Sequence, residues 1–149
     1  MTPSQLRDFD HSVSIALLRA REAVSARFKA HIEARGLTLP QWRVLRALAE
    51  TGEMDVSSLA RRCVVLLPSM TRIIKALEDA QLVHTRRAQD RRRRVVALTQ
   101  QGTALYDELS GPSEEFYRNL EQGFGADRLT QLVNMLNELR ETVEREKKL

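Results

Sequence analysis

The sequence predicts a mainly α-helical fold with one small β-hairpin. From Pro68 onward, apolar side chains recur every three or four positions, which is the period of a helix with one buried face. Two short β-prone segments follow, at residues 82–87 and 95–99, and a run of arginines joins them. A basic hairpin directly after a basic helix indicates a winged helix-turn-helix.

The helix that begins at Pro68 has two distinct faces. Proline suits the first helical turn, where its missing N–H would have no partner in any case. The apolar face would pack inward and consists of Met70, Ile73, Ile74 and Leu77. The opposite, polar face carries Ser69, Thr71, Arg72, Lys75 and Asp79. A recognition helix presents such a face to base edges and phosphates, but an ordinary surface helix is also charged, so the basic hairpin decides the interpretation.

Positive charge is concentrated in this part of the chain. Residues 66–99 contain eight basic and three acidic residues, a formal charge of +5. The whole chain carries only +4, so the remainder has a net charge of −1. A local positive surface on a nearly neutral chain suits a polyanionic partner such as double-stranded DNA.

Length and composition limit the remaining possibilities. A chain of 149 residues with 42% hydrophobic and 30% charged residues predicts one soluble, folded domain. No apolar run approaches the ~20 residues that span a bilayer, so we expect no membrane partner. The N-terminal residues Met1-Thr2-Pro3-Ser4 lack the features of a signal peptide, and we expect a cytoplasmic location. Cys63 is the only cysteine, which excludes an intrachain disulfide.

The N-terminal half predicts three helices before the recognition helix. The first covers about residues 11–35 and stops at Gly36. Thr38 and Gln41 form a capping box that starts a second helix, which ends near Thr51-Gly52. Its inward side chains should be Trp42, Leu45, Leu48 and Ala49. Residues 54–56 could add a short third strand. Asp55 can also cap a helix over residues 56–63, which would be the first half of the helix-turn-helix.

The C-terminal third predicts two further amphipathic helices. Thr99 should cap the first, and Gly111-Pro112 should kink or break it, with a restart at Ser113. Gly125 should end it and Asp127 should cap the last helix, which runs to the basic tail Lys147-Lys148. The last helix has near-heptad apolar positions at Leu129, Leu132, Leu136, Leu139 and Val143. We expect residues 10–36 and 100–149 to form a dimerisation region around a DNA-binding lobe at 37–99, although the stripes could also pack within one chain.

Several of these residues resemble the MarR family of bacterial transcriptional regulators, over nearly the whole chain. The most specific match is Asp90-x-Arg92 followed by Leu98-Thr99-x-x-Gly102. Further matches are Leu37-Thr38-x-x-Gln41-Trp42-x-Val44-Leu45, Leu59-Ala60, Pro68-Ser69-x-Thr71-Arg72, Leu77-Glu78 and Leu82-Val83. A closer resemblance, carried by residues 15–23 and by Gln41-Trp42-Arg43, is to the regulators of homoprotocatechuate (4-hydroxyphenylacetate) degradation operons.

The resemblance implies a homodimeric repressor of an aromatic-compound catabolic operon that releases its pseudo-palindromic operator when a small phenolic or aromatic acid binds. It also implies that Ser69, Thr71 and Arg72 contact the major groove. Arg92 would enter the minor groove and Asp90 would orient it, since a carboxylate can fix a mobile guanidinium. Together with charge, this gives as DNA-binding candidates Ser69, Thr71, Arg72, Lys75, Arg86, Asp90, Arg91, Arg92, Arg93 and Arg94.

Two features depart from the family pattern. Leu66-Leu67 precede the recognition helix where polar residues are common, which leaves its capping open. Gly111-Pro112 interrupts a helix that is usually continuous, which leaves the dimer geometry open.

An aromatic acid needs an apolar slot and a cation for its carboxylate. In the family this slot lies between the dimerisation helices and the winged lobe. The matching candidates are Arg21, Trp42 and Arg46, with Arg21 as the carboxylate partner. Arg21 could instead be an ordinary surface arginine, and Trp42 a core residue.

Two other regulators remain as alternatives. One responds to oxidants through Cys63, although a buried structural thiol is the simpler interpretation because no activating base is evident. The other binds DNA without an effector. His11, His31 and His84 lack metal-ligand spacing, and the sequence contains no nucleophile elbow, phosphate loop or paired carboxylates. We therefore expect no metal, no cofactor and no enzymatic activity.

Overall fold

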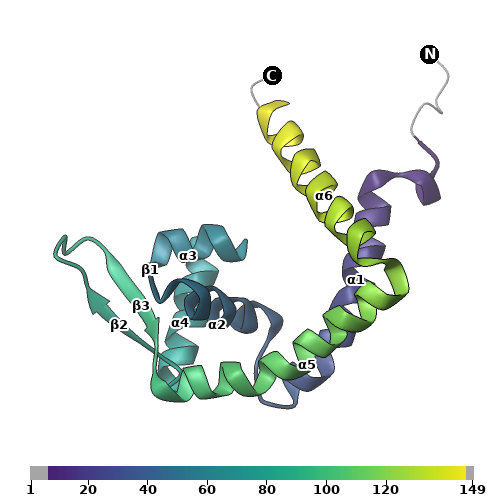
Figure 1. Ribbon diagram of the computed structural model, residues 1–149. Helices are drawn as coiled ribbons and strands as arrows, with labels where there is room; N and C mark the ends of the chain where they lie inside the picture. The colour runs from purple at the N-terminus through teal and green to yellow at the C-terminus, as the bar shows by residue number, and fades with distance from the viewer. Residues whose placement is uncertain (1–6, 147–149) are drawn as a thin grey trace. The chain divides into compact units, whose positions relative to one another are not determined.

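The computed structural model describes residues 7–146 (Figure 1). The tail Lys147-Lys148 and the segment Met1 to Ser4, discussed above, lie outside these residues. The elements in order are a 3-10 helix at Phe9–His11, α1 (Val13–Glu33), α2 (Leu39–Thr51), β1 (Glu53–Asp55), α3 (Val56–Cys63), α4 (Leu67–Asp79), β2 (Val83–Arg87), β3 (Arg94–Leu98), α5 (Gln100–Phe124) and α6 (Ala126–Glu146). The chain divides into two compact units, Met1–Ser110 and Gly111–Leu149.

The predicted winged helix-turn-helix is confirmed in the first unit. The three strands form an antiparallel sheet in the order β1-β3-β2. The hairpin register pairs Val83 with Leu98 and Arg87 with Arg94, and β1 adds Glu53 opposite Ala97. Figure 1 shows the β2–β3 hairpin extending away from the cluster of α2, α3 and α4. The hairpin, called the wing below, therefore stands beside the recognition helix α4.

One core holds α2, α3, α4 and the sheet together. The largest fully buried side chains are Ile32, Val44, Leu45, Leu48, Leu59, Met70, Leu77 and Val96. The predicted inward face of α4 is confirmed, because Met70, Ile74 and Leu77 are buried and Ile73 packs against them. The prediction that Ala49 points inward was wrong: Ala49 is exposed, and Val44 and Ala47 fill the core instead.

Local capping patterns begin α2 and α3 as predicted, whereas α4 has no side-chain cap. The Thr38 hydroxyl accepts a hydrogen bond from the Gln41 N–H (3.2 Å), and the Gln41 side chain accepts one from the Thr38 N–H (3.0 Å). At α3 the Asp55 carboxylate accepts from the backbone N–H of Ser58 (3.1 Å) and from its hydroxyl (2.7 Å). These bonds lower the pKa of Asp55 below its ordinary value of 3.8.

The start of α5 is locked to the end of α4 through Thr99 and Gly102. The Thr99 hydroxyl accepts from the Gly102 N–H (3.0 Å) and donates to the Gln81 carbonyl (2.6 Å), and the Thr99 N–H donates to the Leu82 carbonyl (3.0 Å). A Cβ at position 102 would lie 2.0 Å from the Leu82 carbonyl oxygen. Only glycine therefore permits this approach.

Three sequence-based expectations at helix ends need correction. The first helix begins at Val13, with Ser12 as its cap, rather than near His11. The second correction is that α5 runs unbroken through Gly111-Pro112, so the predicted break with a restart at Ser113 does not occur. Finally, α6 begins at Ala126, which puts Asp127 inside its first turn rather than at the cap.

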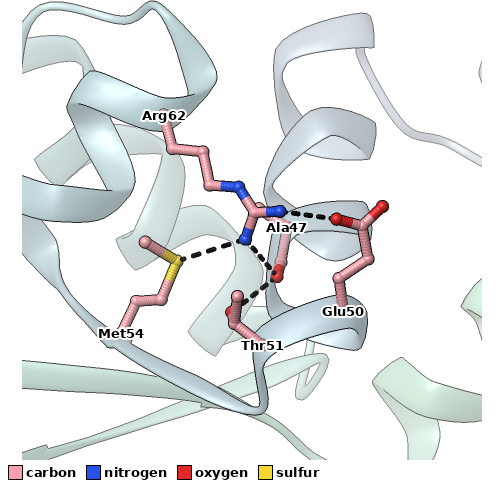
Figure 2. A network of polar contacts seen from close by, with 5 residues as sticks. All are labelled: Ala47, Glu50, Thr51, Met54 and Arg62. Carbon is pink, nitrogen blue, oxygen red and sulfur yellow. Dashed lines mark hydrogen bonds and ion pairs between the residues drawn. The ribbon is translucent and has the colours of Figure 1, made fainter.

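Arg62 fastens α3 to the C-terminal end of α2 (Figure 2). Its guanidinium pairs with the Glu50 carboxylate and donates to the Ala47 carbonyl (3.3 Å), which also accepts from the Thr51 hydroxyl (2.7 Å). The guanidinium nitrogen that donates to the Ala47 carbonyl also lies 4.0 Å from the Met54 sulfur. A cation at a helix C-terminus is favourable because the exposed carbonyls carry negative partial charge.

Replacing Gly102 with alanine should destabilise the fold by at least about 2 kcal/mol, because the added methyl group would overlap a backbone carbonyl. Gly123→Ala is the matched control, since a Cβ there meets nothing within 4 Å. Urea unfolding should show the control as stable as the parent or slightly more stable. Equal stability of the two variants would contradict the steric argument.

Replacing Asp55 with alanine should cost about 1 kcal/mol at neutral pH through loss of the α3 cap. Asp55→Asn keeps an acceptor but not the charge. Since the folded-state pKa is below 3.8, the contribution of the charge is complete above the unfolded-state pKa and disappears as pH falls through the folded-state pKa. The stability difference between the parent and Asp55→Asn, measured by urea unfolding, should therefore shrink on acidification; a constant difference would exclude this titration.

Candidate nucleic-acid interface and ligand pocket

The exposed face of α4 carries the residues that the sequence analysis assigned to DNA. Thr71, Arg72 and Lys75 are exposed, and Ser69 is half-buried. The Arg72 guanidinium lies 3.5 Å from the Ser69 hydroxyl, and Lys75 forms a long ion pair of 4.0 Å with Asp79. Because the opposite face is anchored in the core, these side chains are held on a rigid element.

A groove of about 710 Å³ lies between α3, α4 and the wing. Five basic and two acidic residues line it, so its charge is positive. Thr71, Lys75, Arg92, Arg93 and Arg94 are the predicted DNA-binding residues that it brings together. Ser69, Arg72, Arg86, Asp90 and Arg91 are not among its lining residues.

The groove also contains residues that the sequence analysis missed. Arg61 and the two serines Ser57 and Ser58 approach it from α3, and Thr85 approaches it from β2. No spacing pattern links these positions to α4. Arg61 could have been noticed only as a cation on the first helix of the helix-turn-helix.

The wing tip is a tight turn whose arginines are exposed. The Arg93 N–H donates to the Asp90 carbonyl (2.9 Å), and the Ala88 N–H donates to the Arg93 carbonyl (3.0 Å). Asp90 contacts Arg92 through the backbone N–H of Arg92 (3.3 Å). The carboxylate therefore shapes the turn and does not grip the guanidinium, contrary to the expected side-chain pairing. Within residues 7–146, the guanidinium groups of Arg91, Arg92 and Arg93 form no ion pair.

Two other arginines of the hairpin are engaged inside the protein. Arg86 forms a 2.6 Å ion pair with Glu53 of β1, and Arg94 donates to the Thr85 hydroxyl (2.8 Å). Arg86 is thus a brace between the two edge strands of the sheet, across the central strand β3, with part of its charge neutralised. The unpaired cations at the wing tip are better placed to meet phosphates or a narrow minor groove.

The predicted ligand residues Arg21, Trp42 and Arg46 line one pocket of about 240 Å³ between α1 and α2. The other lining residues are Val24, Ser25, Phe28, Leu39 and Arg43. The lining thus combines aromatic and aliphatic side chains with three arginines and contains no carboxylate. Such a site suits a small molecule that has an apolar body and one anionic group.

Trp42 belongs both to the core and to this pocket. Only 5% of it is exposed, and its indole stacks on the Tyr106 ring at 5.6 Å between centroids and 22° between planes. Tyr106 comes from α5, so the contact packs the indole against that helix. The two interpretations of Trp42 considered above are therefore compatible.

Arg43, which the sequence analysis named only as part of the Gln41-Trp42-Arg43 match and not as a site residue, joins the pocket to the helix-turn-helix. Its side chain lines the pocket and donates a 2.7 Å hydrogen bond to the Cys63 carbonyl at the end of α3. The Cys63 thiol is buried, and burial raises its pKa although the charges of Arg43 and Arg62 oppose this. A protonated, buried thiol reacts slowly with peroxide, so the geometry gives no support to a redox sensor.

Two further kinds of feature are absent from residues 7–146. No helix among residues 7–146 is long and apolar enough to cross a membrane. The same residues contain no group of three or more histidine, cysteine, aspartate or glutamate side chains placed to hold a metal ion.

Comparisons with known proteins agree with this geometry. The MarR family pattern matches residues 37–95. The homoprotocatechuate degradative operon repressor of Escherichia coli is 39% identical over 128 residues, which are 85% of this chain and 86% of that protein. The regulator FarR of Neisseria gonorrhoeae is 36% identical over 129 residues, 86% of this chain and 88% of that protein.

The solved structures add a liganded relative. NadR in complex with 4-hydroxyphenylacetate matches with a TM-score of 0.81 and 36% identity, over 92% of this chain and 96% of that chain. These relatives are transcriptional regulators rather than enzymes. The chain therefore belongs to the MarR family of DNA-binding transcriptional regulators.

Proposed function

We propose that this chain is a homodimeric repressor of an operon for aromatic-compound catabolism, released from a pseudo-palindromic operator when a small aromatic acid binds between α1 and α2. The observation that carries the proposal is the pocket lined by Arg21, Arg43 and Arg46 beside Trp42, without a carboxylate. The relatives named for homoprotocatechuate degradation and for a 4-hydroxyphenylacetate complex support the same chemical class.

The charge distribution supports the DNA half of the proposal. The exposed face of α4 and the unpaired arginines of the wing tip lie on either side of a positively charged groove. We assign the major groove to α4, where Arg72 would reach a guanine edge, and the minor groove to Arg92. Arg86 has a minor role here, because Glu53 already pairs with it.

Exposed apolar side chains support the dimer. In a single chain, α1 leaves Val13, Leu17, Leu18 and Val24 at least 40% exposed, and α6 leaves Leu132, Val133, Met135, Leu136, Leu139 and Val143 at least 36% exposed. Stripes of this kind are unfavourable in water and are covered in stable complexes. Two recognition helices about one DNA turn apart, ~34 Å, would then read two half-sites.

The pocket supports an effector with a single ring. Its volume of about 240 Å³ is small for a drug-sized molecule but suits one aromatic ring with a short acidic side chain. Neither Arg21 nor Arg46 has an ion-pair partner among residues 7–146, so both guanidinium groups are available to a ligand carboxylate. Phe28 and Trp42 supply apolar walls for the ring.

Replacing Arg72 with alanine should weaken binding to an operator, obtained by selection from a random duplex library, by about 1–3 kcal/mol if Arg72 contacts a base. Binding to unselected DNA should weaken less. Arg118→Ala, at an exposed position of α5, is the control and should change neither affinity. An equal loss on both DNAs would make Arg72 a phosphate contact only.

Replacing Arg92 with alanine should lower operator affinity and reduce the slope of log affinity against log salt by roughly 1 per wing, because one fewer counterion is released. Fluorescence anisotropy across a salt series measures both quantities. Affinity and slope equal to those of the parent protein would remove Arg92 from the interface.

Titrating the protein–operator complex with 4-hydroxyphenylacetate should release the DNA, and the neutral amide analogue should not. Arg21→Gln and Arg46→Gln should each raise the required acid concentration by about ten- to a hundredfold, because each removes a charge-assisted hydrogen bond. Operator affinity without ligand should stay unchanged. Arg27→Gln, exposed on α1 outside the pocket lining, is the control. If acid and amide act equally, the arginines do not recognise a carboxylate.

A further inference from the structure

The turn between α3 and α4 exposes an apolar patch, formed by Val64, Leu66 and Leu67. Their side chains are 83%, 79% and 49% exposed. Val64 and Leu66 have the two highest exposed fractions among the large apolar side chains of residues 7–146. Val65, between them, packs against the core instead. Exposed leucines are unfavourable in water, so a concentrated patch of this kind indicates a surface that becomes covered.

The patch is held in a fixed position rather than on a flexible loop. Val64 adopts the left-handed conformation (φ 57°, ψ 52°) that ends α3, and the Val65 N–H donates to the Ala60 carbonyl (3.0 Å). On the other side, the Leu66 carbonyl accepts from the Met70 N–H (2.9 Å). The two leucines are therefore presented by a defined backbone, as a recognition element requires.

The patch is continuous with the proposed DNA-binding surface. Leu66 occupies the cap position of α4 and Leu67 is the first residue of the helix. Leu67 lines the positively charged groove together with Thr71 and Arg92, and its carbonyl accepts from the Thr71 hydroxyl (3.1 Å). Most other strongly exposed apolar side chains lie on α1 and α6. A partner that covers Leu67 in the groove is thus the same partner that meets the wing arginines.

The chemistry of the patch selects one kind of base. A leucine side chain has no hydrogen-bond donor or acceptor, and Leu66 accordingly makes no side-chain hydrogen bond at the cap of α4. Neither leucine can therefore recognise a base by hydrogen bonding. In the major groove, thymine is the one base with an apolar group, its C5-methyl. The N-terminal residues of a recognition helix are the ones that reach base edges. An aliphatic side chain at this place therefore distinguishes thymine from the other bases by contact.

We propose that Leu66 and Leu67 contact thymine methyl groups in each operator half-site and are specificity-determining residues. This inference rests on the proposed use of α4 as the recognition helix. It adds a readout of A·T pairs next to the guanine contact assigned to Arg72. Leu66 and Leu67, which stand where the family commonly has polar residues, would then change which bases are recognised.

The test compares thymine with deoxyuridine, which lacks only the methyl group. A duplex is first selected from a random library with the parent protein, and its affinity is then measured with thymine and with deoxyuridine at each position in turn. Loss of a contacted methyl should weaken binding of the parent by about fourfold per half-site. Leu66→Ala combined with Leu67→Ala should bind the thymine duplex more weakly and give a thymine-to-deoxyuridine affinity ratio near one.

Two matched variants separate the inference from its premise. Leu66→Met combined with Leu67→Met keeps an aliphatic surface and should restore most of the thymine preference. Arg72→Ala should weaken binding to both duplexes while leaving the affinity ratio unchanged. Melting temperature and light scattering confirm that each variant is folded and keeps the oligomeric state of the parent.

Four results would overturn the inference. Equal affinity of the parent for thymine and deoxyuridine at every position would exclude methyl contact, while the proposed function would still stand if Arg72→Ala weakened operator binding. Retention of the thymine preference by the double alanine variant would assign that preference to other residues. Dissociation of the double alanine variant into monomers would show that a second copy covers the patch. Failure of the parent to enrich any duplex would remove the proposed function as well.

Discussion

The close approach of Gly102 to the Leu82 carbonyl sets the position of the wing relative to the recognition helix. Leu82 follows the end of α4 and precedes β2, whereas Gly102 lies in the first turn of α5, directly after β3. The segment before β2 and the segment after β3 are thereby held together. The Thr99 hydroxyl joins them, because it bonds both the Gln81 carbonyl and the Gly102 N–H. A DNA-binding surface composed of a helix and a hairpin needs such a joint, because groove contacts tolerate little relative movement.

Charge on this surface is arranged by pairing as much as by composition. The arginine-rich hairpin supplies many cations, but Glu53 engages Arg86 and the Thr85 hydroxyl engages Arg94. Within residues 7–146, Arg91, Arg92 and Arg93 of the wing tip are among the cations that form no ion pair. Pairing within the strands gives the hairpin rigidity, whereas charge without ion pairs at its tip remains available to phosphates. Counting arginines along the sequence cannot separate these two uses.

The sequence predicted best what depends on neighbours within three or four residues. The caps at Thr38, Asp55 and Thr99 and the buried face of α4 follow from local spacing and were confirmed. Expectations that depend on the wider fold were less successful. Pro112 does not break α5, and Asp90 shapes the wing turn instead of gripping Arg92. Composition and periodicity do not show which groups the tertiary structure brings next to a given residue.

The pocket shows the same division between local and distant information. Family resemblance placed Arg21, Trp42 and Arg46 together but assigned no site role to Arg43, whose partner, the Cys63 carbonyl, is 20 residues away. The Arg43 side chain is thus shared between the pocket and the end of α3. The wall of the small cavity and the last residue of α3, just before the turn that leads to α4, are in this way joined through a single side chain.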